Sequence, residues 1–185
     1  MPHLNIEIKA HCADPSRIRA ALQKNNADFR GIDRQIDTFF NVPYGRLKLR
    51  EGNIEHALIH YQRPDRPGPK PSTVTLYKPP PGPASRAALK EALSGALGVL
   101  AVVDKEREIY FIGNVKFHLD TVKHLGHFVE IEAIDADGEI GGERLLEQCR
   151  DYMALFGIQD QDLVECSYSD LLLRGKCRGE AFPEA

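Results

Sequence analysis

The sequence has no long apolar run and little net charge. Its 185 residues contain no stretch near the roughly 20 apolar residues that cross a bilayer, and its first residues do not resemble a signal peptide. A formal net charge of −3 gives the chain as a whole no attraction for nucleic acid or acidic membranes. We therefore expect a cytoplasmic protein, monomer or homodimer, with no nucleic-acid or membrane partner. Any anion site must then depend on local clustering of bases.

Other common signatures are also missing. The four cysteines, at positions 12, 149, 166 and 177, form no CxxC pair or disulfide framework, and they indicate free thiols in a reducing compartment. There is no GxxxxGK[ST] phosphate loop, and no repeat of about 20–50 residues that would indicate a solenoid. The composition, 42% hydrophobic and 28% charged, is ordinary for a soluble globular protein. We predict one domain over residues 1–175 and a frayed tail over 176–185.

The apolar periodicity predicts eight strands and three main helices. The expected strands cover residues 3–11, 34–40, 45–51, 56–63, 73–78, 102–111, 115–122 and 127–134. A helix is expected after the Asp14 cap, a second one after a Ser85 cap, a third over 143–157, and a short one over 168–173. The Pro- and Gly-rich segment 64–72 predicts an exposed loop.

Charged side chains occupy one face of six of these strands. In "GRLKLRE", for example, the bases alternate with Leu47 and Leu49, and in "HFVEIEAI" the acids alternate with Val129 and Ile131. These faces carry eight bases, which are Lys9, Arg46, Lys48, Arg50, Arg63, Lys105, Arg107 and Lys116. They also carry four acids, which are Glu7, Asp120, Glu130 and Glu132.

Two interpretations of this pattern are open. For any single strand, a solvent face of an antiparallel sheet is the more usual explanation. For the set, the charges are unbalanced from strand to strand, and three helices are few to cover so many apolar faces. A closed barrel with a charged lumen and helices outside accounts for both observations. We therefore predict an α+β fold built on an eight-stranded antiparallel β-barrel, or tunnel, with flanking helices.

A lumen with eight bases and four acids needs neutralising partners, because unpaired charges away from water are costly. Arginine and lysine bind phosphate oxygens, and carboxylates bind a hard cation such as Mg²⁺. A triphosphate with one or two metal ions would use both signs of charge, whereas a single phosphate would leave most of the bases unused.

Several segments, in order, resemble the CYTH superfamily, also called triphosphate tunnel metalloenzymes, which includes class IV adenylyl cyclases and thiamine triphosphatases. They are "NIEIK", which is similar to the family's ExExK, then "QIDTFF", "LKLRE", "HYQR", "DKEREIYF", "HLDTVKHLGHFVEIE" and "SYSDLL". The stretch from "IYFIGN" to "VEIE" resembles the cyclase branch most. The family's first ExExK acid is Asn5 here, which brings an oxygen but no negative charge.

The resemblance implies a cofactor, Mg²⁺ or Mn²⁺, and a set of site residues. The implied metal ligands are Glu7, Asp120, Glu130 and Glu132, of which Glu7, Asp120 and Glu130, together with Lys9, are the expected catalytic residues. The implied phosphate contacts are Lys9, Lys48, Arg50, Arg63, Lys105 and Arg107.

Other residues have two open interpretations. Lys116 shares the charged face, and His118 beside it could contact phosphate, carry a proton or make a lumen hydrogen bond. Lys78 precedes three prolines and could reach the tunnel from its strand end or lie outside it. Asp37 could be functional or a structural hydrogen-bond acceptor, and Arg46 could be a residue of the mouth.

Three functions follow from this site. The first is an adenylyl cyclase-like reaction, from ATP to cyclic AMP and pyrophosphate. The second is hydrolysis of thiamine triphosphate, a nucleoside triphosphate or tripolyphosphate. The third, suggested by Asn5, is triphosphate binding without catalysis.

Overall fold

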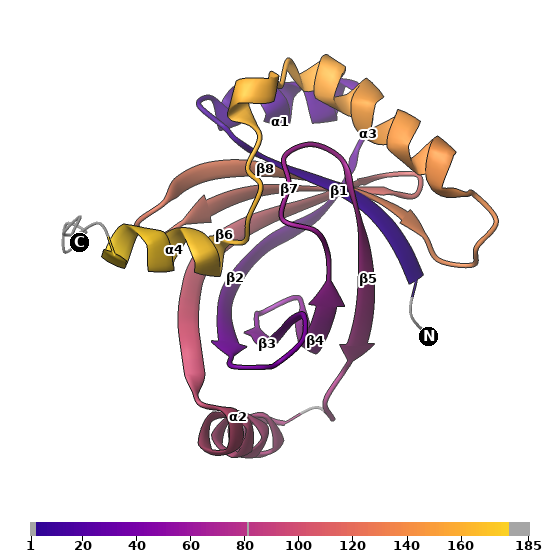
Figure 1. Ribbon diagram of the computed structural model, residues 1–185. Helices are drawn as coiled ribbons and strands as arrows, with labels where there is room; N and C mark the ends of the chain where they lie inside the picture. Colours follow the sequence, from indigo (N-terminus) through magenta and orange to yellow (C-terminus); the bar gives the residue numbers. More distant parts are fainter. Residues whose placement is uncertain (1–2, 81, 178–185) are drawn as a thin grey trace.

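Eight antiparallel strands close into one barrel in the computed structural model, which describes residues 3–80 and 82–177 (Figure 1). The strands are β1 His3–His11, β2 Asp28–Phe40, β3 Arg46–Glu51, β4 His56–Gln62, β5 Lys70–Tyr77, β6 Val99–Ile112, β7 Val115–Val122 and β8 Gly126–Asp135. Around the barrel they follow the order β1-β5-β4-β3-β2-β6-β7-β8. The predicted fold class is confirmed.

The longest pair of strands, β2 and β6, extends beyond the predicted ranges. Their pairing shifts register between Phe29 and Gly31, where an extra residue bulges out of the ladder. Gly31 has φ +118°, a conformation that side-chain-bearing residues rarely adopt, so glycine suits this bulge. The bulge lies near the start of β2, ahead of the residues that face the lumen.

Strand β5 begins inside the segment predicted to be a loop. Lys70 pairs with Glu7 and Ser72 pairs with Asn5 on β1, so the loop prediction for residues 70–72 was wrong. The prediction failed because the prolines of this segment are typical of loops, although β5 begins at Lys70. Pro71 is tolerated because β4 pairs with β5 only from Thr73 onward, which leaves one side of the strand without a ladder partner here.

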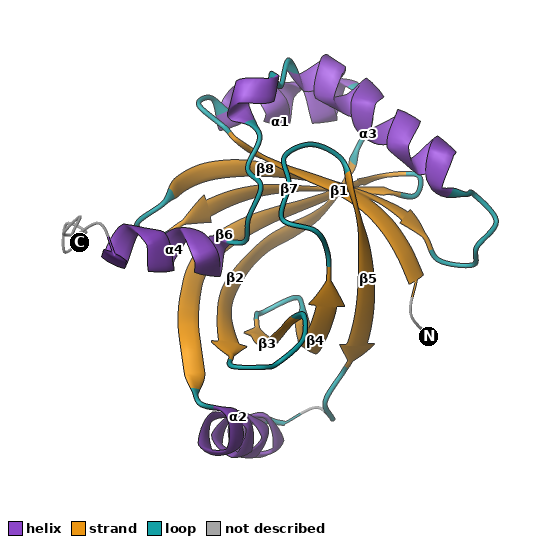
Figure 2. Cartoon of the chain, in the orientation of Figure 1, coloured by secondary structure: helices purple, strands orange, loops and turns teal. Residues whose placement is uncertain are grey.

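Helices α1 (Pro15–Lys24) and α3 (Gly142–Phe156) cover the outer face of β1, β7 and β8 (Figure 2). The Asp14 carboxylate accepts hydrogen bonds from the amides of Ser16 and Arg17, as the predicted cap requires. Leu22 and Leu145, both 0% exposed, pack on the apolar face of these strands. Each such side chain contributes about 1.5–3 kcal/mol relative to an exposed one. One apolar core therefore lies outside the barrel wall, under these helices, and charged side chains lie inside. A second apolar cluster, which includes Phe39, Ile59 and Tyr61, reaches the lumen.

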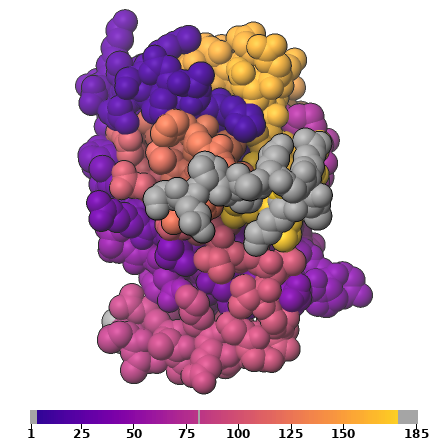
Figure 3. Space-filling model, turned by 90° about the vertical axis from the view of Figure 1, so that its left-hand side faces the viewer, coloured from indigo at the N-terminus to yellow at the C-terminus, as the bar shows by residue number. Residues whose placement is uncertain are grey.

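Two further helices lie at the barrel's ends. Helix α2 (Pro83–Leu97) has no buried residue and lies at the opposite end of the molecule from α1 (Figure 3). It begins at Pro83, so Ser85 lies within its first turn and does not cap it, contrary to the prediction. Helix α4 (Tyr168–Cys177), which follows the short 3₁₀ helix η1 (Asp160–Asp162), packs against β6.

The structure also bears on the predictions about the cysteines, membrane-spanning segments and the C-terminal tail. Cys12, Cys149 and Cys166 are free and buried. Among residues 3–80 and 82–177, no helix is long and apolar enough to cross a membrane. The predicted tail over 176–185 falls mainly outside the described residues, and the boundary at 175 stays a prediction.

Candidate active site

The barrel encloses a cavity of about 590 Å³ that gathers side chains from all eight of its strands. Every predicted site residue except Asp120 lines this cavity. The lining members of the predicted set are Glu7, Lys9, Lys48, Arg50, Arg63, Lys78, Lys105, Arg107, Lys116, His118, Glu130 and Glu132. Arg46 lies away from it, paired with Asp65 and Asp170.

One wall of the lumen is built around Asp37 of β2, which is 1% exposed. Its carboxylate accepts hydrogen bonds from Lys48 Nζ and Lys105 Nζ at 2.8 Å each, and from Arg50 Nε at 2.9 Å. Burial alone would raise the pKa of Asp37, but these three cations hold that pKa well below its ordinary value. We call Asp37, Lys48, Arg50 and Lys105 the Asp37 cluster. In it, one acid orders three bases.

The two lysines of this cluster are poised near neutral pH. Burial lowers the pKa of Lys105 to about 7, and Arg107 and Arg50 act in the same direction. Burial also lowers the pKa of Lys48 to about 8, with Arg50 adding to the effect. The ammonium groups of Lys48 and Lys105 therefore lose their protons more readily than an exposed lysine does.

The opposite wall is formed by β1 and β8, and its acids come from both strands. The register places Glu7 opposite Glu132, and Lys9 opposite Glu130. Lys9 Nζ lies 3.1 Å from Glu130 Oε1, and Arg63 from the end of β4 pairs with Glu7. We call Glu7, Glu130 and Glu132 the glutamate wall.

Glu132 is the least compensated acid of this wall. Burial raises the pKa of its carboxyl, and the nearby Glu7 and Glu130 raise it further, although Lys116 acts against them. Asn5 Nδ2 donates a hydrogen bond to Glu132 Oε1 at 2.5 Å. The other end of that amide, Asn5 Oδ1, is buried without a hydrogen-bond partner among the described residues.

Two more polar atoms beside the glutamate wall have no hydrogen-bond partner within the part of the chain that the structure describes. They are Arg63 Nε and His118 Nε2. His118 Nδ1 lies 3.2 Å from Glu130 Oε2, and burial, with Arg107 and Lys116, lowers the pKa of His118 to about 3. If Nδ1 carries the proton for that contact, the neutral ring presents Nε2 as an acceptor. Such a ring would suit a hydroxyl better than a phosphate oxygen.

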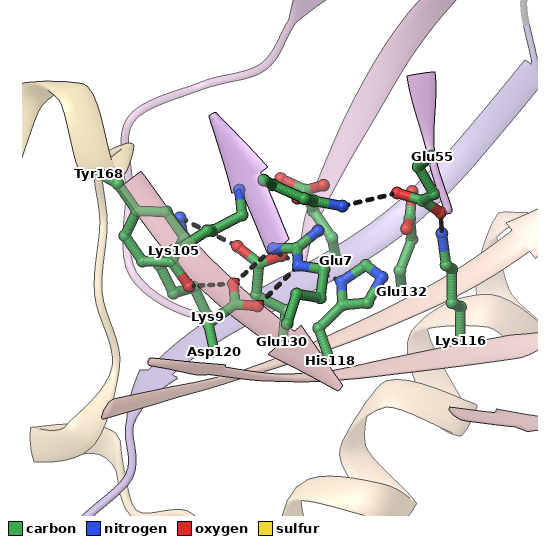
Figure 4. A network of polar contacts seen from close by, with 12 residues as sticks. Glu7, Lys9, Glu55, Lys105, Lys116, His118, Asp120, Glu130, Glu132 and Tyr168 are labelled. Atoms are coloured by element: carbon green, nitrogen blue, oxygen red, sulfur yellow. Dashed lines mark hydrogen bonds and ion pairs between the residues drawn. The ribbon is translucent and has the colours of Figure 1, made fainter. Parts of the chain in front are cut away.

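Asp120 occupies a different position from the other acids. Arg107 Nε donates to Asp120 Oδ1 at 2.6 Å, and the Tyr168 hydroxyl donates to Asp120 Oδ2 at 2.8 Å (Figure 4). Arg107 also donates to Glu130 Oε2 at 2.7 Å. The predicted role of Asp120 as a metal ligand would require these bonds to be exchanged. In the arrangement described here, Asp120 orients Arg107.

Among the residues of the lumen that the sequence did not identify, two carry polar groups that contact the predicted bases. Glu55 precedes β4 and pairs with Arg50 and Lys116, and Tyr168 at the start of α4 places its ring 3.6 Å from Lys9 Nζ. Strand parity cannot find a loop residue such as Glu55. For Tyr168 there was a signal, because it lies in the motif "SYSDLL".

A divalent cation fits the glutamate wall only with help from a ligand. Among the described residues, no group of three or more His, Cys, Asp or Glu side chains is arranged to hold a metal ion. However, Mg²⁺ commonly takes one or two protein carboxylates and completes its shell with phosphate oxygens and water. Glu132, with its raised pKa, and the unpartnered oxygen of Asn5 provide such a partial donor set. The residues therefore fit a hard cation that arrives with a phosphate compound.

The strands close into an antiparallel barrel, and charged side chains surround its central cavity. These two features place the protein in the class of tunnel-shaped β-barrels. The chain belongs to the CYTH family, because the model of the CYTH domain matches residues 3–168. Comparison with curated proteins gives no match.

Similar structures support the same fold at low sequence identity. The PH1012 protein from Pyrococcus horikoshii OT3 has a TM-score of 0.70 at 23% identity, over 90% of this chain and 98% of that one. A Vibrio parahaemolyticus protein proposed to be an adenylate cyclase has a TM-score of 0.73 at 19% identity, over 94% and 99%. HpAC1 from Hippeastrum, proposed to be an adenylyl cyclase but described as having a dominant triphosphatase activity, has a TM-score of 0.54 at 14% identity, over 97% and 98%.

Proposed function

We propose that this protein is a divalent-metal-dependent enzyme that acts on a nucleoside triphosphate in its tunnel, converting ATP to cyclic AMP and pyrophosphate. One observation carries the proposal. Three buried polar atoms along the glutamate wall have no hydrogen-bond partner among the described residues, and each suits a different kind of ligand group. Asn5 Oδ1 can bind a cation, Arg63 Nε can donate to an anion, and His118 Nε2 can accept from a hydroxyl. ATP bound with Mg²⁺ or Mn²⁺ offers all three groups at once.

The phosphate chain would lie between the two walls. Lys9, Arg63 and Arg107 approach it from the glutamate side, and Lys48 and Lys105 approach it from the Asp37 cluster. The ion pairs that these bases make in the free protein hold their side chains in the lumen before substrate arrives. Such preorganised cations stabilise the charge that develops on phosphate oxygens during transfer.

The nucleoside would lie against an apolar part of the same cavity. This apolar part is formed by Ala57, Ile59, Val74, Leu76, Pro79 and Pro80, from β4, β5 and the segment after β5. Inorganic tripolyphosphate has no group to place there. The apolar surface therefore favours an organic triphosphate.

The bound cation would supply charge neutralisation at the reacting phosphate, with Glu132 and Asn5 Oδ1 as its protein ligands and Glu7 or Glu130 beside them. In the cyclase reaction, the ribose 3′-oxygen would form a bond to the α-phosphorus as the bond from that phosphorus to the α,β-bridging oxygen breaks in line. Pyrophosphate would leave, and the hydroxyl proton would pass to water. His118 Nε2 would accept the hydrogen bond of that hydroxyl, and Glu130 would fix the ring through Nδ1. Lys9 and Arg63 would hold the leaving pyrophosphate.

Hydrolysis of a triphosphate is a second candidate, and one observation favours it. Basic side chains from β1, β3, β6 and β7 line the cavity and could hold a phosphate chain by themselves, and a water molecule would need no nucleoside pocket to attack the terminal phosphorus. HpAC1, with its dominant triphosphatase activity, has the same fold. The two reactions differ in which phosphorus lies beside the cation.

The test is to incubate the protein with ATP, thiamine triphosphate or tripolyphosphate and Mg²⁺ or Mn²⁺, and to follow products by phosphorus NMR. Cyclic AMP with pyrophosphate supports the cyclase, whereas orthophosphate supports hydrolysis. Binding without turnover would leave a triphosphate-binding protein. The exposed Arg34→Ala variant serves as a control that should match the wild-type protein.

A further inference from the structure

Glu55 is an acid of the lumen for which the proposed function has no use. Its carboxylate accepts a hydrogen bond from Arg50 Nη1 at 2.7 Å through Oε2, and it pairs with Lys116 through Oε1. Arg50 belongs to β3 and Lys116 to β7, so the acid bridges the cavity. Burial alone would raise the pKa of Glu55, but Arg50 and Lys116 hold that pKa well below its ordinary value. Glu55 is therefore an anion in the lumen.

The loop that carries Glu55 is built to hold it there. The Asp33 carboxylate, 0% exposed, accepts hydrogen bonds from the amides of Ile54 and Glu55 at 2.8 Å each. Gln35 Nε2 donates to Asp33 Oδ2 at 2.7 Å and contacts Glu55 Oε2 at 3.3 Å. At Gly52, an added Cβ would lie 2.6 Å from Asp33 Oδ1, so only glycine lets the loop wrap around this carboxylate. A buried acid, an amide and a glycine thus fix one side chain.

The position of Glu55 matters as much as its charge. Figure 4 shows Glu55 and Lys116 at one end of the polar network, with Tyr168 and Lys105 at the other and His118 between them. Ile54, Gly82 and Arg86 line the cavity together with Glu55, so this end faces the start of α2. An inorganic phosphate chain leaves the nucleoside part of the cavity free, so it would meet the Glu55 carboxylate if it extended from the bases near Tyr168 toward α2.

We propose that Glu55 is a specificity residue that limits the length of the phosphate chain in the tunnel. The carboxylate takes up Arg50 and Lys116 as a built-in counter-anion, so these bases are not available to a further phosphate. It also repels any phosphate that reaches this end, because like charges brought together out of bulk water repel each other strongly. The inference rests on the proposed function, since it assumes that the lumen binds a phosphate chain.

The experiment compares two probes, inorganic tripolyphosphate and a linear polyphosphate several units longer. Their dissociation constants are measured by titration calorimetry with EDTA present, so that neither metal nor turnover contributes. In Glu55→Gln, the preference should shift toward the longer chain by roughly tenfold relative to the wild-type protein, because one repulsive charge is lost and two bases are released. Glu55→Asp keeps the charge and should keep the wild-type preference.

Glu51→Gln is the matched control. Glu51 belongs to the same hairpin but pairs with Lys90 of α2 at 2.6 Å, and it does not line the lumen cavity. Its chain-length preference should equal that of the wild-type protein. Glu55→Ala provides a second test, because Asp33 holds the loop through backbone amides that this change retains.

An unchanged ratio of the two dissociation constants in Glu55→Gln and Glu55→Ala would overturn the inference, even if both probes bound more tightly. In that case Glu55 would be a general counter-ion, and the proposed function would stand if the wild-type protein bound tripolyphosphate. If the wild-type protein bound neither probe, with or without Mg²⁺, the proposed function would fail as well.

Discussion

The two walls of the lumen carry charges of similar number but differ in how those charges are satisfied. In the Asp37 cluster, one acid meets three bases, and none of its four members has a buried polar atom without a partner in the described part of the chain, although Gln35 Oε1 and Thr38 Oγ1 of the same strand do. Along the glutamate wall, unpartnered atoms of Asn5, Arg63 and His118 lie beside the three acids.

This difference indicates what each wall contributes. A satisfied buried network is rigid, whereas a buried group without a partner costs stability until a ligand supplies one. We infer that the Asp37 cluster is mainly a support that positions bases, and that the glutamate wall is the part completed by metal and substrate. Substitutions in the Asp37 cluster should therefore affect mainly stability, and substitutions along the glutamate wall should affect mainly binding.

The largest effect is expected from breaking the support. Asp37→Asn removes the charge that Lys48, Arg50 and Lys105 share, and it leaves buried cations uncompensated. We expect the free energy of unfolding to fall by about 3–5 kcal/mol, as for other broken buried ion pairs. Urea unfolding followed by circular dichroism measures this. Glu147→Gln breaks the exposed pair with Arg144 and should leave the free energy of unfolding almost unchanged. Equal losses in the two variants would mean that the cluster is not a support.

A smaller effect is expected at the unsatisfied wall, and on binding more than on stability. Arg63→Ala removes a guanidinium whose Nε has no partner in the free protein. Binding of tripolyphosphate should weaken by about 1.5–3 kcal/mol, the range for hydrogen bonds to charged groups. Titration calorimetry measures the change, and the exposed Arg34→Ala is the control. An affinity equal to that of the wild-type protein would place the phosphate chain away from Arg63.

Glu132 allows the contribution to fold stability and the contribution to metal binding to be measured separately at one residue. Its folded-state pKa is raised by burial and by Glu7 and Glu130, so ionised Glu132 destabilises the fold above its unfolded pKa. Glu132→Gln should therefore leave the free energy of unfolding unchanged or slightly higher at neutral pH. Its affinity for Mn²⁺ in the presence of ATP should fall by about tenfold. The affinity can be followed by electron paramagnetic resonance, and a variant that lost stability but kept Mn²⁺ affinity would refute this assignment.

The charged inner face was within reach of the sequence, because the side-chain period of a strand is local. Alternation along "GRLKLRE" and "HFVEIEAI" was enough to assign the bases and the acids to the inner face, and the structure confirms the barrel that this implied. The family resemblance then supplied the order of the motifs.

What the sequence left open depends on contacts between distant segments. Asp37 meets Lys105 across 68 positions, and parity identifies a face but not a partner on it. Glu55 lies outside any strand and reaches the lumen only because Asp33 fixes its loop. Asp120 faces inward as expected, but Arg107 and Tyr168 cover it. Register and barrel closure decide these contacts, and neither is encoded in a local pattern.

The smallest effect is the pH dependence caused by Lys105. Raising the pH should change its contribution to fold stability and its contribution to tripolyphosphate binding in opposite directions. Burial lowers the folded-state pKa of Lys105 to about 7, whereas an unfolded lysine titrates near its model value of 10.5. Between these values the unfolded chain binds the extra proton, so the Lys105 contribution to the free energy of unfolding rises with pH. Tripolyphosphate binding should move the other way, and weaken by roughly threefold between about pH 6 and about pH 8, because Lys105 loses its charge.

Lys105→Gln isolates this contribution. The probe itself gains negative charge over the same range, so the informative quantity is the difference between the wild-type protein and the variant at each pH. That difference in binding free energy should be largest at low pH and should shrink as the pH rises through 7. A difference that stayed constant would mean that Lys105 keeps its proton throughout, held by Asp37. The Asp37 cluster would then act as a permanently charged wall, which would make its contrast with the glutamate wall sharper still.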